Sequence, residues 1–220
     1  MNHVTRVIAI RHGETAWNVD TRIQGQLDIP LNDTGRWQAE RLGAALADEG
    51  LEAIYSSDLL RAHETAQAVG RATGLVVHSD VGLRERGFGS FQGHTYAEIT
   101  ERWPEASERW RRREIDFSPG ENGESLRVFY DRCIGTAERL AAAHPGQTIA
   151  LVAHGGVMDC LYRAASRLDL QAARSWTLGN ASINRLLYTP EGFTLVGWSD
   201  TSHLDSGSLD ESNDRVGHAA

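Results

Sequence analysis

The sequence contains no lysine, so all 22 of its basic residues are arginine. This absence excludes reactions that depend on a lysine amine: Schiff-base formation, phosphate binding by a Walker-type P-loop and the ATP-binding lysine of protein kinases. The formal net charge is −8. A chain this acidic is not expected to present a surface devoted to nucleic acid or anionic lipid. If its ligand is an anion, a local pocket of positive groups must bind it.

Cysteine and metal-binding patterns are also scarce. The two cysteines, Cys133 and Cys160, are not spaced as a CxxC pair, and no HExxH or comparable arrangement of metal ligands occurs. We therefore predict two free thiols, as in a reducing cytoplasm, and neither a disulfide nor a bound metal. No other cofactor is expected.

Long apolar runs are missing as well. No segment approaches the roughly 18 apolar residues needed to span a bilayer, so no membrane association is expected. Residues 1–10 have a short apolar stretch but no basic n-region and no small-residue cleavage site. They are therefore predicted to form a strand rather than a signal peptide. Together these features favour a cytoplasmic protein.

The composition is that of one globular domain. Hydrophobic residues make up 40% and charged residues 24% of the 220 positions. We predict a single domain over residues 1–204, without internal repeats. The end of the chain, residues 205–220, is rich in serine, glycine and aspartate, and we expect it to be a disordered acidic tail.

Short apolar runs predict strands, and amphipathic segments between them predict helices. The expected strands are residues 7–10, 53–55, 75–77, 148–153, 183–188 and 193–198, the last two antiparallel. The expected helices are residues 34–48, 59–72 and 125–143, with Asp58 as N-cap of the second and a capping box at 95–98 opening another. Strands that alternate with helices predict an α/β fold of three layers, α/β/α, around a mostly parallel central sheet.

Three polar clusters directly follow predicted strands: Arg11-His12, residues 56–61 and His154. Ligands bind at the carboxyl ends of the strands in such a sheet, so we expect these clusters to meet. A guanidinium group pairs with two phosphate oxygens, and histidine can act as nucleophile, base or cationic donor. The combination suits a phosphoryl group.

Five longer blocks occur in order before residue 157. They are RHGETAWN (11–18), QGQLDIPLNDTG (24–35), SSDLLRAHETA (56–66), LRERGFGSFQG (83–93) and VAHGG (152–156). In these blocks the chain resembles the histidine phosphatase superfamily, also called the phosphoglycerate mutase-like family. The resemblance implies that family's fold and a metal-independent phosphatase that acts on a small phosphorylated metabolite. One RHG alone would be unspecific, whereas five blocks in order are specific.

The resemblance also implies roles for individual residues. His12 would be the nucleophile that becomes phosphohistidine, and Glu85 the general acid that protonates the leaving oxygen. The residues that would bind phosphate are Arg11, Asn18, Arg61 and His154. The residues that match substrate-contacting positions of relatives are Gln24, Gly25, Arg86 and Gly155.

This chemistry requires particular states of the side chains. A nucleophilic His12 has to be neutral, with its other ring nitrogen donating to a backbone carbonyl near Gly13. Two guanidinium groups and a cationic His154 would offset the charge of roughly −1.5 to −2 on a phosphomonoester. Because an alkoxide leaves poorly, Glu85 has to carry a proton for it.

Simpler interpretations compete with some assignments. Arg61 could be a surface residue paired with Glu64, and Glu85 could form a surface salt bridge with its neighbouring arginines; the surrounding blocks favour the site in both cases. The arginine run 111–113 is predicted to be a solvated helix face. The remaining histidines are expected to be ordinary surface or half-buried residues.

The family contains mutases as well as phosphatases. Arg86 and the segment 110–114 are similar to mutase residues that surround the substrate carboxylate. Mutases have tyrosine, lysine and asparagine where this chain has Phe88, Tyr96 and Gly156. Because lost anchors favour transfer to water, we expect a phosphatase, with a cofactor-dependent phosphoglycerate mutase as the alternative. A non-catalytic phosphate-binding module is a remote alternative, since both His12 and Glu85 are present.

Residues 94–123 correspond to the variable region that covers the pocket in relatives, so the resemblance implies a lid-like insertion. Its aromatic residues Tyr96, Trp103 and Trp110 are expected to pack the lid rather than line the pocket. The phosphorylated substrate stays open at this point, and a homodimer is possible because many relatives form one.

Overall fold

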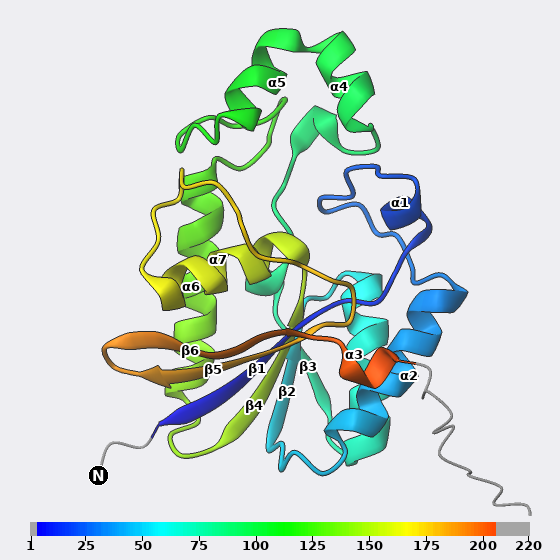
Figure 1. The fold of residues 1–220 in the computed structure, drawn as a ribbon, viewed down its shortest axis with the longest axis vertical. Coiled ribbons are helices and arrows are strands. Elements are labelled where there is room, and N and C mark those ends of the chain that lie inside the picture. Colours follow the sequence, from blue (N-terminus) through cyan, green and yellow to red (C-terminus); the bar gives the residue numbers. More distant parts are fainter. Residues whose placement is uncertain (1–3, 206–220) are drawn as a thin grey trace, which may run out of the picture.

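The computed structural model describes residues 4–205, which form one six-stranded sheet flanked by helices (Figure 1). The strands are β1 (Thr5–Arg11), β2 (Ala53–Ser56), β3 (Val77–Ser79), β4 (Thr148–Ala153), β5 (Ile183–Thr189) and β6 (Gly192–Asp200). Their order across the sheet is β3-β2-β4-β1-β5-β6. The first four strands of this order are parallel, and β5 is antiparallel to both of its neighbours. The predicted mostly parallel sheet is confirmed, as is its late antiparallel pair.

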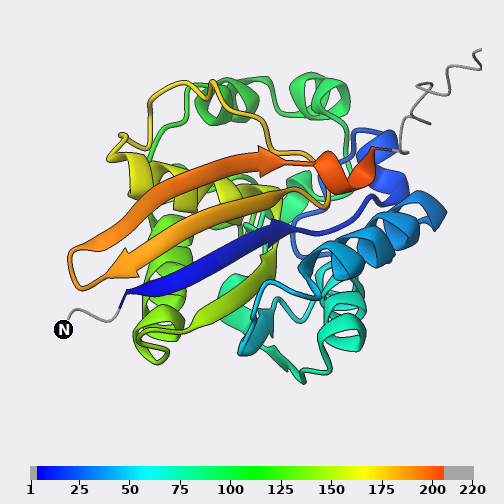
Figure 2. The same ribbon diagram turned by 60° about the horizontal axis from the view of Figure 1, so that its bottom comes forward.

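Helices cover both faces of this sheet. They are α1 (Ala16–Val19), α2 (Asp33–Leu46), α3 (Leu60–Thr73), α4 (Tyr96–Arg102), α5 (Pro104–Arg111), α6 (Leu126–Ala142) and α7 (Gly155–Ser166). The pair α2–α3 packs on one face and the pair α6–α7 on the other, while β5 and β6 extend the sheet at one edge (Figure 2). The predicted three-layer α/β/α architecture is confirmed.

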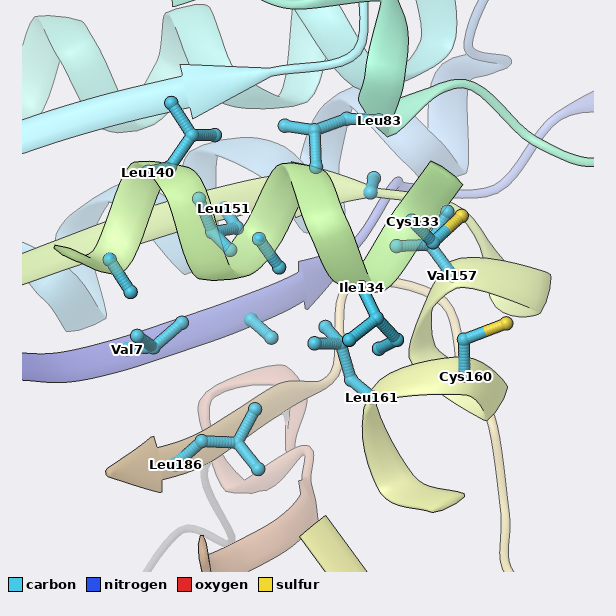
Figure 3. Packing of buried hydrophobic residues seen from close by; sticks show 14 of the residues in the cluster. Val7, Leu83, Cys133, Ile134, Leu140, Leu151, Val157, Cys160, Leu161 and Leu186 are labelled. Atoms are coloured by element: carbon cyan, nitrogen blue, oxygen red, sulfur yellow. The ribbon is translucent and has the colours of Figure 1, made fainter. Parts of the chain in front are cut away.

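Strand β1 contributes to a hydrophobic core on each face. Val7 and Ala9 belong to the core under α6 and α7, whereas Ile8 and Ile10 belong to the core under α2 and α3. Successive side chains of a strand point to opposite faces, so a strand buried on both faces is apolar throughout. Figure 3 shows the first core, where Ile134 of α6 packs over the strands. The two cysteines are free and buried in this same core.

Local signals correctly predict several helix ends. The Thr95 hydroxyl accepts a hydrogen bond from the Glu98 amide at 3.2 Å, and the Glu98 carboxylate accepts one from the Thr95 amide at 2.8 Å. This is the predicted capping box of α4. Helix α3 ends at Thr73, and its C-cap Gly74 has a φ of 73°, in the left-handed region that glycine adopts without steric cost.

The third strand begins two residues later than predicted. The structure has β3 at Val77–Ser79 instead of residues 75–77. After the C-cap of α3 at Gly74, the chain needs Leu75 and Val76 to reach the sheet, and pairing with β2 begins only at Val77. Val76 is 72% exposed, so its apolar character does not mark a buried strand.

Asp58 does not cap α3, which corrects a further prediction. Leu59 occupies the N-cap position, and no side chain caps the helix there. The Asp58 carboxylate instead accepts hydrogen bonds from the Arg84 guanidinium at 2.7 and 2.5 Å. The amide of Leu60 donates to Asp28 Oδ1 at 2.7 Å. Ion pairing to a distant loop has replaced the local cap.

Helices α4 and α5 pack on each other and stand apart from the three layers (Figure 1). They belong to the segment 94–123 that is predicted to be a lid. None of the helices in residues 4–205 is long and apolar enough to span a bilayer. The description ends at Asp205, so the predicted disordered tail lies almost wholly outside the described residues.

Candidate active site

A cavity of about 630 Å³ opens where the predicted polar clusters meet, at the carboxyl ends of the parallel strands. The predicted site residues that line it are Arg11, His12, Asn18, Gln24, Gly25, Arg61, Glu85, Arg86 and Gly155. Because β1 lies beside β4, and β4 beside β2, blocks far apart in sequence end side by side. Of the predicted site residues, His154 lies outside the cavity lining.

His12 directly follows β1 and is only 3% exposed. Its Nδ1 lies 2.6 Å from the carbonyl oxygen of Gly13. A carbonyl only accepts hydrogen bonds, so Nδ1 carries the proton of the neutral ring and the lone pair is on Nε2. Burial, together with the charges of Arg61 and Arg11, lowers the pKa of His12 well below its ordinary value of 6.5. The ring is therefore neutral at pH 7, the form that a nucleophile needs.

Arg61 of α3 is 1% exposed, and its side chain lines the cavity. Its guanidinium donates to the carbonyl oxygens of Gly25 at 2.7 Å and Leu27 at 2.9 Å. It is thus no surface partner of Glu64. Burial lowers the pKa of Arg61 to about 10, so the group stays charged at neutral pH. Its Nε has no hydrogen-bond partner in residues 4–205.

Arg11, the last residue of β1, supplies a second buried guanidinium. Its Nη1 donates to the carbonyl oxygen of Leu178, while its Nε has no partner within the described chain. Burial is the main cause of its lowered pKa. Gly155 lies against this side chain, since a Cβ there would be 3.4 Å from the Arg11 Nε. Arg11 and Arg61 together give the cavity two cationic forks with unused donors.

His154 lies next to His12 but does not line the cavity. Its side chain is completely buried, and the centroids of the two rings are 5.3 Å apart. Its Nε2 is 2.8 Å from the Ser57 hydroxyl. Burial and the nearby Arg61 charge lower the pKa of His154 well below 6.5. The protein by itself therefore keeps this ring neutral, and the expectation of a cationic His154 is wrong for the isolated chain.

The Asn18 side chain is engaged within the protein. Its Oδ1 accepts hydrogen bonds from the Thr15 amide at 3.0 Å and from Asn180 Nδ2 at 3.3 Å. The same Asn180 amide group donates to the carbonyl oxygens of His12 at 3.0 Å and Gly13 at 3.2 Å. Asn180 thus connects the Asn18 side chain with the backbone of His12 and Gly13. No local pattern in the sequence predicts this role.

Gln24 and Gly25 form the part of the wall that Arg61 holds. Gln24 is 8% exposed, and its Oε1 has no hydrogen-bond partner in the described structure. Gly25 has a φ of 52°, and a Cβ at this position would lie 2.1 Å from Gln92 Oε1. Only glycine fits this close contact.

The Glu85 carboxyl group is held by two backbone amides. Oε1 accepts from the amide of Arg86 at 2.8 Å and Oε2 from the amide of Gly156 at 2.9 Å. Gly156 lies in the first turn of α7, so the carboxyl group docks at a helix N-terminus. Glu85 forms no ion pair with Arg84 or with the Arg86 side chain, which excludes the surface salt-bridge interpretation. It lines the same cavity as His12.

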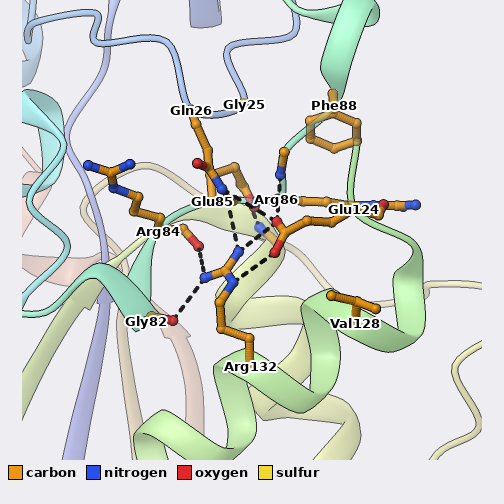
Figure 4. Close-up of polar contacts among 12 residues, drawn as sticks. Gly25, Gln26, Gly82, Arg84, Glu85, Arg86, Phe88, Glu124, Val128 and Arg132 are labelled. Atoms are coloured by element: carbon orange, nitrogen blue, oxygen red, sulfur yellow. Dashed lines mark hydrogen bonds and ion pairs between the residues drawn. The ribbon is translucent and has the colours of Figure 1, made fainter. Parts of the chain in front are cut away.

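The loop that carries Glu85 is fixed by Arg132 of α6 (Figure 4). The carbonyl oxygens that accept from this guanidinium belong to Gly82, Arg84 and Glu85, at 2.9 to 3.2 Å. Arg132 also pairs with the Glu124 carboxylate at 2.7 Å. Hydrogen bonds to helix α6 therefore hold this loop in position.

Arg86 lines the cavity with a guanidinium that the backbone holds. It donates to the carbonyl oxygens of Glu124 at 2.9 Å and Phe117 at 3.1 Å. Burial lowers its pKa to about 10. Its orientation is thus set by the backbone of residues 117 and 124, which precede α6.

Arg113 corrects the prediction of a solvated arginine run at 111–113. The first two arginines of the run pair with Glu108 on the exposed face of α5, as predicted. Helix α5 has ended by then, and Arg113 adopts a φ of 54° that turns its side chain into the cavity wall. There its guanidinium lies 3.1 Å from Asp159 Oδ2, and the buried Arg163 binds the same oxygen at 2.9 Å.

Aromatic side chains form much of the outer wall. They are Trp17, Phe88, Tyr96, Trp110 and Trp176. Tyr96 and Trp110 stack with ring centroids 4.9 Å apart, so they pack the segment 94–123 and line the cavity at once. Trp103 packs against Phe91 and does not line the cavity. The packing prediction holds for Trp103 and is incomplete for the other two.

The cavity offers an anion the guanidinium groups that line it, beside the N-terminus of α7, where Glu85 already binds the Gly156 amide. In the described residues, no group of three or more histidine, cysteine, aspartate or glutamate side chains is arranged to hold a metal ion. A neutral imidazole, two guanidinium groups and a carboxyl group line one space. This set can bind a phosphoryl group, attack it and exchange a proton with its leaving group.

Comparisons with known proteins agree with this geometry. The phosphoglycerate mutase-like protein 4 of Arabidopsis thaliana is 40% identical over 202 residues, which cover 90% of this chain and 86% of that protein. The metal-independent phosphoserine phosphatase of the same plant is 37% identical over 210 residues, covering 93% and 85%.

A solved structure of a mycobacterial glucosyl-3-phosphoglycerate phosphatase is 34% identical and superposes with a TM-score of 0.79, covering 89% of this chain and 99% of that one. The family model for the histidine phosphatase superfamily (branch 1) matches residues 7–201. The match includes all six strands, apart from the first two residues of β1, and every block that lines the cavity. The chain belongs to the histidine phosphatase superfamily.

Proposed function

We propose that this protein is a phosphatase that hydrolyses a small phosphorylated metabolite through a phosphohistidine intermediate on His12. One observation carries the proposal: a neutral His12, with Nδ1 bonded to the Gly13 carbonyl, lies between two guanidinium groups whose Nε atoms have no partner among residues 4–205. The first feature leaves a lone pair on Nε2, and the second leaves donors for phosphate oxygens.

In the first step, His12 Nε2 attacks the phosphorus atom of the monoester. A nitrogen–phosphorus bond forms, the bond from phosphorus to the ester oxygen breaks, and Glu85 gives its proton to that oxygen. The alcohol product leaves. In the second step, water attacks the phosphorus, Glu85 takes a proton from the water, and the nitrogen–phosphorus bond breaks to release inorganic phosphate and neutral His12.

Charge stabilisation comes from Arg11 and Arg61. The transferred phosphoryl group spreads its negative charge over three oxygens, so fixed cations around it lower the barrier. The His154 ring packs against His12, with the ring centroids 5.3 Å apart. Its protonation state depends on the charge of the phosphoryl group. Bound phosphate would favour its protonation, because an anion opposes the two guanidinium charges that keep it neutral.

Two of the named relatives act on phosphoserine and glucosyl-3-phosphoglycerate, which are small phosphorylated metabolites. A cavity of about 630 Å³ accommodates a molecule of that class. The cytoplasmic location, the homodimer and the lid function of residues 94–123 stay predictions from the sequence.

A mutase is the second candidate, because one relative bears a mutase-like name. One observation favours hydrolysis: Arg113, which corresponds to the mutase-like arginine segment, is already paired with Asp159.

The test is phosphate release from a panel of phosphorylated metabolites, with a phosphoglycerate mutase assay run in parallel. We expect hydrolysis that EDTA does not inhibit and that His12→Ala abolishes, while the exposed His78→Ala control retains it. Brief exposure to a labelled monoester should leave acid-labile, base-stable label on the wild type and none on His12→Ala. Stable label on a serine or aspartate would overturn the phosphohistidine mechanism, and faster isomerisation than hydrolysis would identify a mutase.

A further inference from the structure

Ser57 is a completely buried serine that directly follows β2. Its amide donates to the carbonyl oxygen of Val152 in β4 at 2.9 Å, which fixes the serine beside the end of that strand. His154 directly follows β4, and His12 directly follows β1, the next strand of the sheet. The His154 ring therefore contacts both neighbours: its Nε2 lies 2.8 Å from the Ser57 hydroxyl oxygen, and its centroid lies 5.3 Å from that of the His12 ring.

A single hydrogen lies between Nε2 of His154 and the hydroxyl oxygen of Ser57, and either atom could carry it. Burial lowers the pKa of His154, so the ring is neutral and has one N–H. The Ser57 oxygen already accepts a hydrogen bond from the amide of Leu59 at 3.3 Å. Within residues 4–205, Nδ1 of His154 has no partner, and the Ser57 hydroxyl has no acceptor besides Nε2.

These contacts favour Ser57 as the donor. If Nε2 of His154 carried the hydrogen, two buried groups would lack partners: the hydroxyl hydrogen and the lone pair on Nδ1. If the hydroxyl group donates to Nε2, only the Nδ1–H lacks a partner. Because a buried polar group without a partner is costly, the second arrangement is the more stable one. The neutral ring of His154 therefore carries its hydrogen on Nδ1.

We propose that Ser57 is a positioning residue that holds His154 in this tautomer, with the Nδ1–H as a neutral hydrogen-bond donor to the phosphoryl group. The inference rests on the proposed phosphatase function, because a phosphoryl group at His12 supplies the acceptor that Nδ1 lacks. In this tautomer His154 can bind a phosphate oxygen without first taking up a proton. Ser57 does not line the cavity, so it acts through the ring.

Nitrogen-15 NMR of the imidazole rings at pH 7 tests the tautomer directly, because protonated and unprotonated ring nitrogens differ in chemical shift. The His154 signals are identified by their loss in His154→Gln. In the wild type the protonated nitrogen should be Nδ1, and in Ser57→Ala the hydrogen should redistribute toward Nε2. A hydrogen on Nε2 in the wild type would overturn the proposal whether or not the variant folds, as would an unchanged preference in Ser57→Ala.

The same spectra test the donor role. Saturating inorganic phosphate should shift the Nδ1 signal of His154 in the wild type, because the Nδ1–H gains an acceptor. An Nδ1 signal that phosphate leaves in place would show that His154 does not donate to the phosphoryl group, and would overturn that part of the proposal.

Kinetics with p-nitrophenyl phosphate test whether the tautomer matters for the reaction. Ser57→Ala should lower kcat/KM about 10- to 100-fold, as the loss of an orienting partner does at other histidine sites. Ser57→Thr retains the hydroxyl group and should recover most of this loss. In a His154→Gln background, Ser57→Ala should cause roughly 2-fold further loss or less, since Ser57 acts through that ring. Fully additive losses would show a merely structural effect and overturn the proposal.

The matched control is Ser56→Ala. Ser56 is the adjacent serine and is equally buried, but its hydroxyl group donates to the backbone carbonyl of Ser57 at 2.8 Å. This variant should change neither the tautomer of His154 nor kcat/KM. Equal effects in Ser56→Ala would show a general disturbance at the end of β2 and overturn the proposal. Failure of the proposed function is recognised separately, by the absence of His12-dependent hydrolysis of any monoester.

Discussion

The amide of Gly156 donates a hydrogen bond to Glu85 Oε2 at 2.9 Å, and a Cβ on Gly156 would lie 2.2 Å from the other oxygen of that carboxyl group. The first turn of α7 and the carboxyl group therefore fit together only if residue 156 is glycine.

Gly156→Ala should therefore displace Glu85 and lower kcat for an alkyl phosphate by on the order of 10-fold or more, with the fold retained. Gly135→Ala in α6 is the matched control, because a Cβ there meets nothing within 4 Å and alanine favours a helix. Steady-state kinetics and thermal unfolding of both variants check this. Full activity in Gly156→Ala would show that the carboxyl position is not critical.

Arg61→Lys should lower kcat/KM on the order of 10²-fold or more. A lysine amine has no fork for phosphate oxygens and cannot also hold the carbonyl groups of Gly25 and Leu27, which Arg61 binds. Arg71→Lys is the control on the same helix, since Arg71 is exposed and pairs only with Glu40. Near-wild-type kinetics for Arg61→Lys would place this guanidinium outside the phosphate site.

The fold and the inner site follow from the sequence because parallel strands end at the same edge of a sheet. Arg11-His12 follows β1 and His154 follows β4, and these two strands are paired in register from Arg6 to Arg11. Apolar runs locate the buried strands, so the residues directly after them are brought together without any knowledge of the side-chain contacts.

The sequence does not predict the positions of side chains that are held by distant partners. The local sequence predicts that Asp58 caps a helix, yet its carboxylate pairs with Arg84 instead. The local sequence predicts that Arg113 belongs to a solvated arginine run. Its left-handed φ instead turns its side chain toward Asp159. Asn180 follows no motif at all. In each case the deciding contact spans more than 25 positions, which local propensity and periodicity do not encode.

Acid should destabilise the protein in a way that depends on His12. Burial and the arginine charges lower its pKa in the folded state, whereas the unfolded chain titrates near the ordinary value of 6.5. Below pH 6.5 the unfolded state binds a proton that the folded state does not, so the free energy of unfolding falls as the pH falls toward the folded-state pKa. His12→Asn should make this slope shallower by about 1.4 kcal/mol per pH unit. Chemical denaturation between pH 7 and 5 measures it, and an unchanged slope would contradict a neutral His12.

Asp159→Ala should destabilise the fold by about 3–5 kcal/mol, because it leaves the completely buried Arg163 without its carboxylate partner. Asp116→Ala is the matched control: it removes an aspartate from the exposed pair with Arg127 and should leave the unfolding midpoint where it is. Urea titration of both variants makes the comparison. If Asp159→Ala lost no more than the control, the buried pair would contribute little to stability.

Glu85→Gln offers the most direct test of the general acid. It keeps the size of the side chain, removes the proton transfer and gives up one of the two backbone hydrogen bonds, because the amide nitrogen of Gln does not accept. Only the lost proton transfer makes the effect depend on the leaving group. An alkoxide needs a proton badly, whereas p-nitrophenolate leaves readily without one. We expect a loss of roughly 10²–10⁴-fold on an alkyl phosphate and a far smaller loss on p-nitrophenyl phosphate, provided that phosphorylation of His12 limits both rates.

The control for this experiment is Glu14→Gln. Glu14 is close to His12 in sequence, but its carboxylate accepts from Asn32 Nδ2 at 2.8 Å and does not line the cavity. This variant should therefore treat the two substrates as the wild type does. Equal losses on both substrates in Glu85→Gln would mean that Glu85 only positions the loop around Arg86. A selective loss in Glu14→Gln would instead assign the proton transfer to Glu14, because selectivity for the poor leaving group distinguishes a proton donor from a structural carboxylate.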